Sequence, residues 1–158
     1  MGSPPEDTYS VTVHPQRFAP LVEVARALRE HVVATYDVSV DGDRLLPADP
    51  QAAPLTIEIH DFPMVEVRAG VAGHERFPVC GCDACDDDVE QLMADLEDFV
   101  LAVVGGGFHE RWVRGGLGQS WNGRDGERSS WGKQGDRAIR RALKQRGRGA
   151  VWQPWPAR

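Results

Sequence analysis

The sequence predicts a single α+β domain in which two amphipathic helices pack on an antiparallel sheet. Residues 18–36 and 88–104 repeat apolar side chains at spacings of three and four, as a helix with one buried face does. Residues 55–69 instead alternate apolar and polar side chains, as half-buried strands do. Because helices and strands follow one another in blocks, a parallel sheet built from βαβ units is not expected.

The first helix is predicted to begin near Pro15 and to end near Tyr36. Proline suits the first turn of a helix, where its missing N–H leaves no hydrogen bond unmade. We expect residues 1–8, which precede the helix, to form a flexible leader. The buried face of the helix should consist of Phe18, Leu21, Val22, Ala25, Leu28 and Val32.

Short strands are predicted after this helix. Residues 38–40 show a brief strand pattern, and the turn residues and prolines of segment 41–54 then favour a surface loop. Residues 55–59 and 65–69 alternate clearly, and the Asp-Phe-Pro sequence at 61–63 supplies a turn between them. We therefore expect these two strands to pair antiparallel, with their apolar faces against the first helix.

The second helix is predicted over residues 88–104. Asp87, with Glu90 three residues later, resembles a capping box at its start, and the three glycines at 105–107 provide its end. These glycines are not expected to bind phosphate, because they follow a helix instead of leading into one.

The C-terminal third contains further regular elements. Residues 108–114 resemble a strand, and the Asn-Gly and Asp-Gly dipeptides between Trp121 and Trp131 predict a hairpin or a long ordered loop. Asp136 is a candidate cap for a third, mostly basic helix that runs to Gln145.

Charge is distributed unevenly along the chain. Residues 1–100 carry 20 acidic and 6 basic side chains, a net charge of −14, whereas residues 101–158 carry 4 and 12, a net charge of +8. We place one α+β domain over residues 9–132 and a basic segment over residues 133–158, which we expect to dock on it. The asymmetry favours attraction between the two halves or between identical copies. The expected partner is therefore a second copy, in a homodimer, or an unidentified protein.

Composition excludes several classes of protein. With 41% hydrophobic and 27% charged residues, the chain of 158 residues resembles an ordinary globular domain rather than a disordered or fibrous chain. No apolar run approaches the ~20 residues that span a bilayer, and the first residues lack the pattern of an export signal. Three cysteines within six positions suit a metal site or reduced thiols better than disulfides. We therefore expect a cytoplasmic protein without a membrane partner.

The cysteine cluster is the most specific chemical signal in the sequence. Cys82 and Cys85 have the two-residue spacing that lets a tight turn direct both sulfurs at one tetrahedral ion, and Cys80 is close enough to join them. The helix that follows presents unpaired N–H groups to these thiols, which favours the thiolate form. We predict that the three cysteines bind a structural Zn²⁺ ion.

A closed tetrahedral zinc site requires a fourth ligand. His74, six residues before Cys80, is the first candidate, and His109 and His60 are alternates from the predicted strands. His60 shares the strand face of Glu58, so a solvent-facing role is the simpler interpretation for it. His74 is explained equally well as an ordinary loop histidine.

Other interpretations of these residues remain open. The three thiols could simply be reduced, or Cys82 and Cys85 could form a redox-active pair at a helix start. The order of strands and helices does not match a thioredoxin-like protein, however, and Cys80 would then be unexplained. A metal-dependent enzyme would use His109 and Glu110 beside an open zinc position. Because adjacent residues on a strand point to opposite faces, we do not expect catalysis.

Several short stretches together carry a family resemblance. They are Asp61-Phe62-Pro63, Arg68-Ala69-Gly70, the sequence PVCGCDACD from Pro78 to Asp86, and the helix after it, which ends near Phe108-His109-Glu110. On these stretches, most of the chain resembles an uncharacterised actinobacterial family, domain of unknown function 6226. The resemblance implies no activity. Met64 departs from it, because a second glycine is expected after the Phe-Pro pair.

Nucleic-acid binding is an alternative that we do not favour. Aromatic and basic side chains together can bind a single strand, and both types are concentrated in the C-terminal third. The whole chain is nevertheless acidic, with a net charge of −6, and has no recognised reading motif. We therefore predict a zinc-binding domain that acts as a protein-interaction module. The five tryptophans of this region are Trp112, Trp121, Trp131, Trp152 and Trp155.

Overall fold

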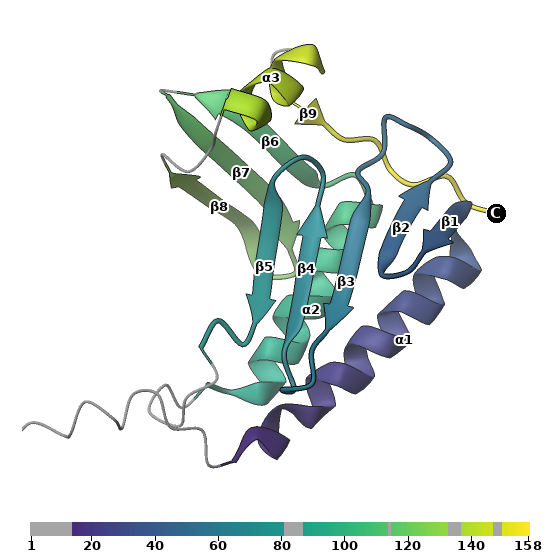
Figure 1. Cartoon of the computed structure of the whole chain (residues 1–158), viewed down its shortest axis with the longest axis vertical. Coiled ribbons are helices and arrows are strands. Elements are labelled where there is room, and N and C mark those ends of the chain that lie inside the picture. Colours follow the sequence, from purple (N-terminus) through teal and green to yellow (C-terminus); the bar gives the residue numbers. More distant parts are fainter. Residues whose placement is uncertain (1–13, 81–86, 114, 133–136, 147–149) are drawn as a thin grey trace, which may run out of the picture.

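The computed structural model describes residues 14–80, 87–113, 115–132, 137–146 and 150–158. Over these residues the α+β prediction is confirmed, but three α-helices accompany two antiparallel sheets instead of one (Figure 1). The strand order is β1-β2-β3-β4-β5 in the first sheet and β8-β7-β6-β9 in the second. The elements are a 3-10 turn Pro15–Phe18, α1 Ala19–Thr35, β1 Val38–Asp41, β2 Arg44–Pro47, β3 Leu55–Ile59, β4 Val65–Ala69, β5 Gly73–Phe77, α2 Val89–Val104, β6 Phe108–Val113, β7 Gly116–Gly123, β8 Gly126–Gly132, α3 Arg137–Gln145 and β9 Ala150–Val151.

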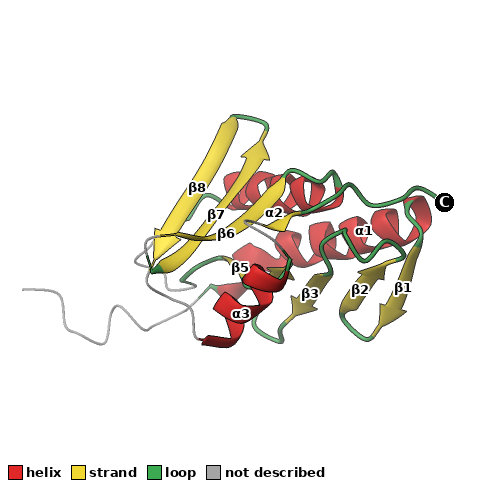
Figure 2. Ribbon diagram, turned by 90° about the horizontal axis from the view of Figure 1, so that it is seen from above, coloured by secondary structure: helices red, strands yellow, loops and turns green. Residues whose placement is uncertain are grey.

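The two long helices cover one face of the first sheet (Figures 1 and 2). The predicted stripe of α1 is buried at four positions, and alternate residues of β3 and β4 meet it. Burying a Val, Leu or Ile side chain contributes about 1.5–3 kcal/mol, so this layer is a main source of stability. Its buried residues include Leu21, Ala25, Leu28 and Val32 of α1 and Leu55, Ile57, Val65 and Val67 of the sheet.

Helix α2 also packs against the second sheet. The ring of Phe99 makes edge contacts with Phe108 of β6 and Trp121 of β7, at centroid distances of 5.8 Å and 5.1 Å. Such pairs add about 0.5–1.5 kcal/mol beyond the area that they bury. One helix thus belongs to the core on both sides, and it holds the two sheets together.

The C-terminal residues run along both sheets, as the yellow segment in Figure 1 shows. Strand β9 pairs with β6, and the side chains of Trp152 and Trp155 are each 3% exposed. The indole N–H of Trp155 donates to the carbonyl of Ala53, and the backbone N–H of Asp37 donates to Pro156. The last residues therefore bridge the β1–β3 region and the second sheet.

Several local predictions are corrected by the structure. Segment 41–54 contains strand β2, because Gly42 adopts a positive φ of 58° and turns the chain back on β1. The segment around His74 forms strand β5 at the edge of the first sheet. The cap of α2 is Asp88 and not Asp87, since its side chain accepts from the N–H groups of Glu90 and Gln91.

The hairpin of the second sheet turns at only one of the two predicted dipeptides. Asp125-Gly126 lies at the β7–β8 turn, whereas Asn122-Gly123 belongs to β7 itself. Among the described residues, no helix has both the length and the apolar character needed to cross a membrane.

Candidate metal-binding sites

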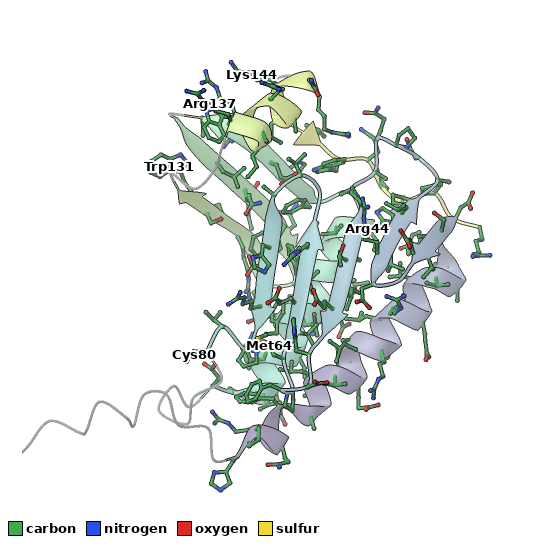
Figure 3. All side chains as sticks on the ribbon, in the orientation of Figure 1. Arg44, Met64, Cys80, Trp131, Arg137 and Lys144 are labelled. Atoms are coloured by element: carbon green, nitrogen blue, oxygen red, sulfur yellow. The ribbon has the colours of Figure 1, made fainter. Side chains whose placement is uncertain are left out.

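The cysteine segment connects the end of β5 to the start of α2. Cys80 is exposed, and Figure 3 shows it beyond the end of the first sheet where the β3–β4 turn with Met64 also lies. Cys82 and Cys85 lie outside the described residues. Both neighbouring elements are anchored, because Phe77 is only 6% exposed and Asp88 caps α2.

The histidines proposed as the fourth ligand lie on the two sheets. His74 is on β5, three residues before its end, which corresponds to about 10 Å along the strand. Its Nε2 atom lies 3.3 Å from the Glu66 carboxylate. His60 follows β3 and shares that end of the first sheet with Cys80, whereas His109 is on β6 of the second sheet. The structure therefore brings His60 and His74 to one carboxylate, that of Glu66.

Glu66 is the centre of a polar cluster on the face of the first sheet opposite the helices. Although only 6% of the residue is exposed, its carboxylate is surrounded by nitrogen atoms. His60 Nε2 lies 3.6 Å from one oxygen and Arg76 Nε 3.3 Å from the same oxygen. Arg68 and His74 approach the other oxygen at 3.4 Å and 3.3 Å. This cluster is called the Glu66 cluster below, and it also includes Glu58, 3.8 Å from His60.

Strand register explains why these side chains meet. Glu58 lies directly opposite Glu66 across β3 and β4, and Glu66 lies opposite Arg76 across β4 and β5. Residues two apart on a strand point to the same face, which adds His74 to the group. The backbone N–H of His60 donates to the carbonyl of Met64, and this bond holds the histidine at the end of the hairpin.

The environment of Glu66 favours its ionised form. Burial acts to raise the pKa of its carboxyl, but the hydrogen bond to His74 opposes that effect. The positive charges of Arg76, His74 and His60 oppose it further, and the net result is a pKa below the ordinary value of 4.5. At neutral pH the group is therefore a carboxylate, which is the form that binds a cation.

Three residues of the Glu66 cluster have the chemistry and spacing of metal ligands. One oxygen of Glu58, one ring nitrogen of His60 and one oxygen of Glu66 all lie within 4.8 Å of one another. Of these three residues, only His60 was recognisable from the sequence as a candidate ligand. The available signal was the two-residue spacing of Glu58 and His60, together with a second glutamate placed to face Glu58 across the predicted hairpin.

Glu110 occupies a different environment from that of His109. Its carboxylate is 1% exposed and accepts hydrogen bonds from the N–H groups of Val71 and Ala72 at 2.8 Å and 2.7 Å. Trp152 Nε1 and Gln119 Nε2 donate to it as well, at 3.0 Å and 3.4 Å. Glu110 thus ties the β4–β5 turn to the second sheet and to the C-terminal segment. With its oxygens occupied in this way, it is a poor candidate for a general base.

The tryptophans of the C-terminal third are mostly structural. Trp152 and Trp155 are buried, while Trp112 and Trp121 are half-buried and pack against the core. Trp131 is 52% exposed, and its indole N–H donates to Val113. A surface on which successive bases stack would need several exposed rings. Four exposed basic side chains lie on α3, where Figure 3 labels Arg137 and Lys144; the other two are Arg140 and Arg141.

Comparison with known proteins gives a family but no activity. No curated protein and no solved structure matches the chain. A family model described as "Family of unknown function (DUF6226)" matches residues 1–158. Since the match covers the whole sequence, the chain belongs to this family.

Proposed function

We propose that this protein is a zinc-binding interaction module in which Cys80, Cys82 and Cys85 hold one structural Zn²⁺ ion. The observation that carries the proposal is the presence of three thiols within six positions, directly before a capped helix. Tetrahedral zinc sites commonly take two thiolates from such a short turn. The N-terminus of α2 supplies a positive dipole end that stabilises thiolates at this point in the chain.

Features of the neighbouring elements support a structural role for the ion. A knuckle between Phe77 and Asp88 would join the edge strand β5 to α2, the helix that holds both sheets together. Metal binding in small modules contributes about 10–16 kcal/mol to folding, but this chain has its own core, so we expect a much smaller global effect.

The fourth ligand remains a choice between three histidines. His74 is nearest along the chain, but to ligate the ion it would have to leave Glu66. His60 shares the sheet end of Cys80 and would also have to leave that carboxylate. His109 belongs to the second sheet. A set of single His→Gln variants assigns the ligand when Co²⁺ binding is followed by its thiolate charge-transfer absorption, because only one of them should weaken binding at the cysteines.

An exposed apolar side chain beside the cysteines supports the interaction role. Val79 is 78% exposed, more than the other large apolar side chains of the described residues that remain exposed. Exposed apolar groups rimmed by polar residues are typical of contact surfaces. The partner is a second copy of the chain or another protein, in keeping with the opposite charges of the two halves.

Zinc content and thiol reactivity test the proposal together. Purified untagged protein should contain at least one zinc ion per chain, and its three thiols should react with an alkylating reagent only after a chelator removes the metal. A Cys82→Ser variant should lose the ion. Protein without stoichiometric metal and with all thiols freely reactive would contradict the proposal.

The interaction role has its own test. Sedimentation velocity of the zinc-loaded protein should show a self-associated form, or a complex with a purified candidate partner, that Val79→Ser weakens. Val40→Ser is the matched control, because Val40 is also exposed, at 48%, but lies on β1. An equal effect of both substitutions would place the contact surface elsewhere.

The nucleic-acid alternative now depends mainly on α3. Burial of four tryptophans within or against the core removes most of the aromatic contribution. Binding through Arg140 and Arg141 would weaken steeply with added salt and would be lost when both are changed to Gln.

A further inference from the structure

We propose a second metal site, distinct from the cysteines, in which Glu58, His60 and Glu66 bind one divalent transition-metal ion. The three side chains come from one β-hairpin, and together they offer two carboxylate oxygens and one imidazole nitrogen. This site is separate from the proposed zinc knuckle and contains no thiol ligand.

The distances fit a single ion. His60 Nε2 lies 3.8 Å from the Glu58 oxygen and 3.6 Å from the Glu66 oxygen. In a tetrahedral site with ligand bonds of about 2.1 Å, neighbouring ligand atoms lie about 3.4 Å apart. The two carboxylate oxygens lie within 4.8 Å of each other, so side-chain movements of about 1 Å bring the three atoms onto one metal.

The ring of His60 supplies an independent observation. Its Nε2 atom is buried and has no hydrogen-bond partner among the described residues. A buried polar atom without a partner is unfavourable, and native proteins rarely keep one. The nitrogen faces both carboxylates at distances too long for a hydrogen bond and suitable for an ion between them.

Two carboxylates directly opposite each other also point to a cation. Glu58 and Glu66 are cross-strand partners, and like charges in this position destabilise a sheet. Glu66 is buried as well, so its charge requires compensation. Arg68 and Arg76 provide some, but their side chains are 60% and 51% exposed and can move into solvent when an ion binds.

The ligand set defines the kind of metal. An imidazole with two carboxylates suits Zn²⁺, Co²⁺ or Ni²⁺ better than Mg²⁺ or Ca²⁺, which prefer oxygen alone. Three protein ligands leave at least one position for water, as exchangeable sites do. His74, hydrogen bonded to the other oxygen of Glu66, is a positioning residue that orients the carboxylate.

The decisive experiment removes the cysteine site and keeps the second one. Zn²⁺ is titrated into the full chain with Cys80, Cys82 and Cys85 changed to Ser, and binding is followed by calorimetry. This variant should bind about one ion per chain. Adding His60→Ala should weaken binding about 100-fold or more, because even a residue that only supports a ligand is worth about 10–100-fold. Adding His31→Ala, an exposed histidine on α1, should change nothing.

Substitution of Arg76 changes Zn²⁺ affinity in a direction that a cluster with only a structural role would not produce. Arg76→Gln removes a cation that competes for Glu66, so it should tighten Zn²⁺ binding by about 2- to 5-fold. His74→Gln should weaken it by about 10-fold. The proposal is overturned if the thiol-free chain binds no Zn²⁺, or if binding survives His60→Ala unchanged.

Spectroscopy of the natural chain covers the case in which the thiol-free variant does not fold. Co²⁺ bound by thiolates gives a strong charge-transfer absorption, whereas Co²⁺ bound by oxygen and nitrogen does not. The natural chain should bind one equivalent of Co²⁺ that does not give this absorption, and His60→Ala should fail to bind that equivalent. If His60→Ala still binds it, the second site is wrong. Loss of the thiolate signal alone would count against the cysteine proposal only, so the two failures are distinguishable.

Discussion

The carboxylates of Glu66 and Glu110 are both buried, but the groups that surround them are of different kinds. Each residue places a carboxylate in a strand with almost no exposure, 6% for Glu66 and 1% for Glu110. Glu110 receives four N–H donors from uncharged groups, two of them from the backbone. Glu66 is instead approached by two histidines and two arginines, whose side chains are 33–60% exposed.

The difference separates a structural group from an exchangeable one. Backbone donors to Glu110 are fixed by the β4–β5 turn, so no other partner can replace them without rebuilding the turn. The partners of Glu66 are side chains that are 33–60% exposed and regain water when they turn away, so another cation can replace them at the buried carboxylate. A site for a ligand is therefore expected at Glu66 and a stabilising anchor at Glu110.

The largest expected effect is at Glu110. Glu110→Gln replaces one acceptor oxygen by an NH₂ group, which would face donors from Val71, Ala72 or Trp152. Each buried donor left without an acceptor costs about 1–3 kcal/mol. We expect the free energy of unfolding, measured by urea denaturation, to fall by about 3 kcal/mol.

Glu66→Gln is the matched control for this variant. Its arginine partners remain hydrated, so the free energy of unfolding at neutral pH should change by less than about 1 kcal/mol. Equal losses in the two variants would show that the comparison between anchor and exchangeable group is wrong.

A glycine beside Glu110 gives an effect of similar size. Gly70 has a positive φ of 62°, and a Cβ atom there would collide with the Glu110 carboxylate and lie 2.9 Å from Trp152 Nε1. Gly70→Ala should lower the free energy of unfolding by about 3 kcal/mol, since overpacking costs about 1–3 kcal/mol and the backbone strain about 1–2 kcal/mol. Thermal and urea unfolding both report this loss.

Gly42→Ala isolates the backbone part of that cost. Gly42 has a similar φ of 58°, but an added Cβ would have no atom within 4 Å. Its loss should be only about 1–2 kcal/mol. If both substitutions cost the same, contact with Glu110 contributes nothing to the need for glycine at position 70.

Local periodicity explains which parts of the fold could be predicted from sequence. α1, α2, β3 and β4 carry apolar stripes with a clear period, and each was predicted within a few residues. Strand β5 lacks such a pattern, because its alternate positions hold Gly73 and the half-buried Glu75 before Phe77. Its assignment depends on pairing with β4, which is information that the segment itself does not contain.

For the candidate site as well, only the features that depend on local sequence could be predicted. His60 and His74 were recognisable as potential ligands by residue type alone. Their convergence on Glu66 depends on the register of three strands, which turn geometry and tertiary packing set. Glu66 itself looked like an ordinary exposed strand residue, since nothing local indicates that its outer face is buried.

The smallest predicted effect is a difference in the pH dependence of stability between Glu66 and Glu75, which lie on opposite faces of the first sheet. The pKa of Glu66 lies below 4.5 in the folded protein, so its contribution to stability is present above that pH and is lost as pH falls through the folded value. Glu66→Gln should therefore flatten the decline in unfolding free energy in acid. Urea denaturation at a series of pH values from 6 downwards, at about half-unit steps, measures this slope.

Glu75 should contribute to the pH dependence of stability in the opposite direction. Burial raises the pKa of its carboxyl, and Asp95 adds to the rise, although His74 and Arg128 act against it. The fold thus favours the protonated form, and the contribution of Glu75 is present below 4.5 and lost as pH rises through the folded value. Glu75→Gln should make the protein relatively more stable at neutral pH, with the gain vanishing in acid. If both variants shift the pH profile in the same direction, the charges around Glu66 do not control its ionisation, and its readiness to bind a cation must have another cause.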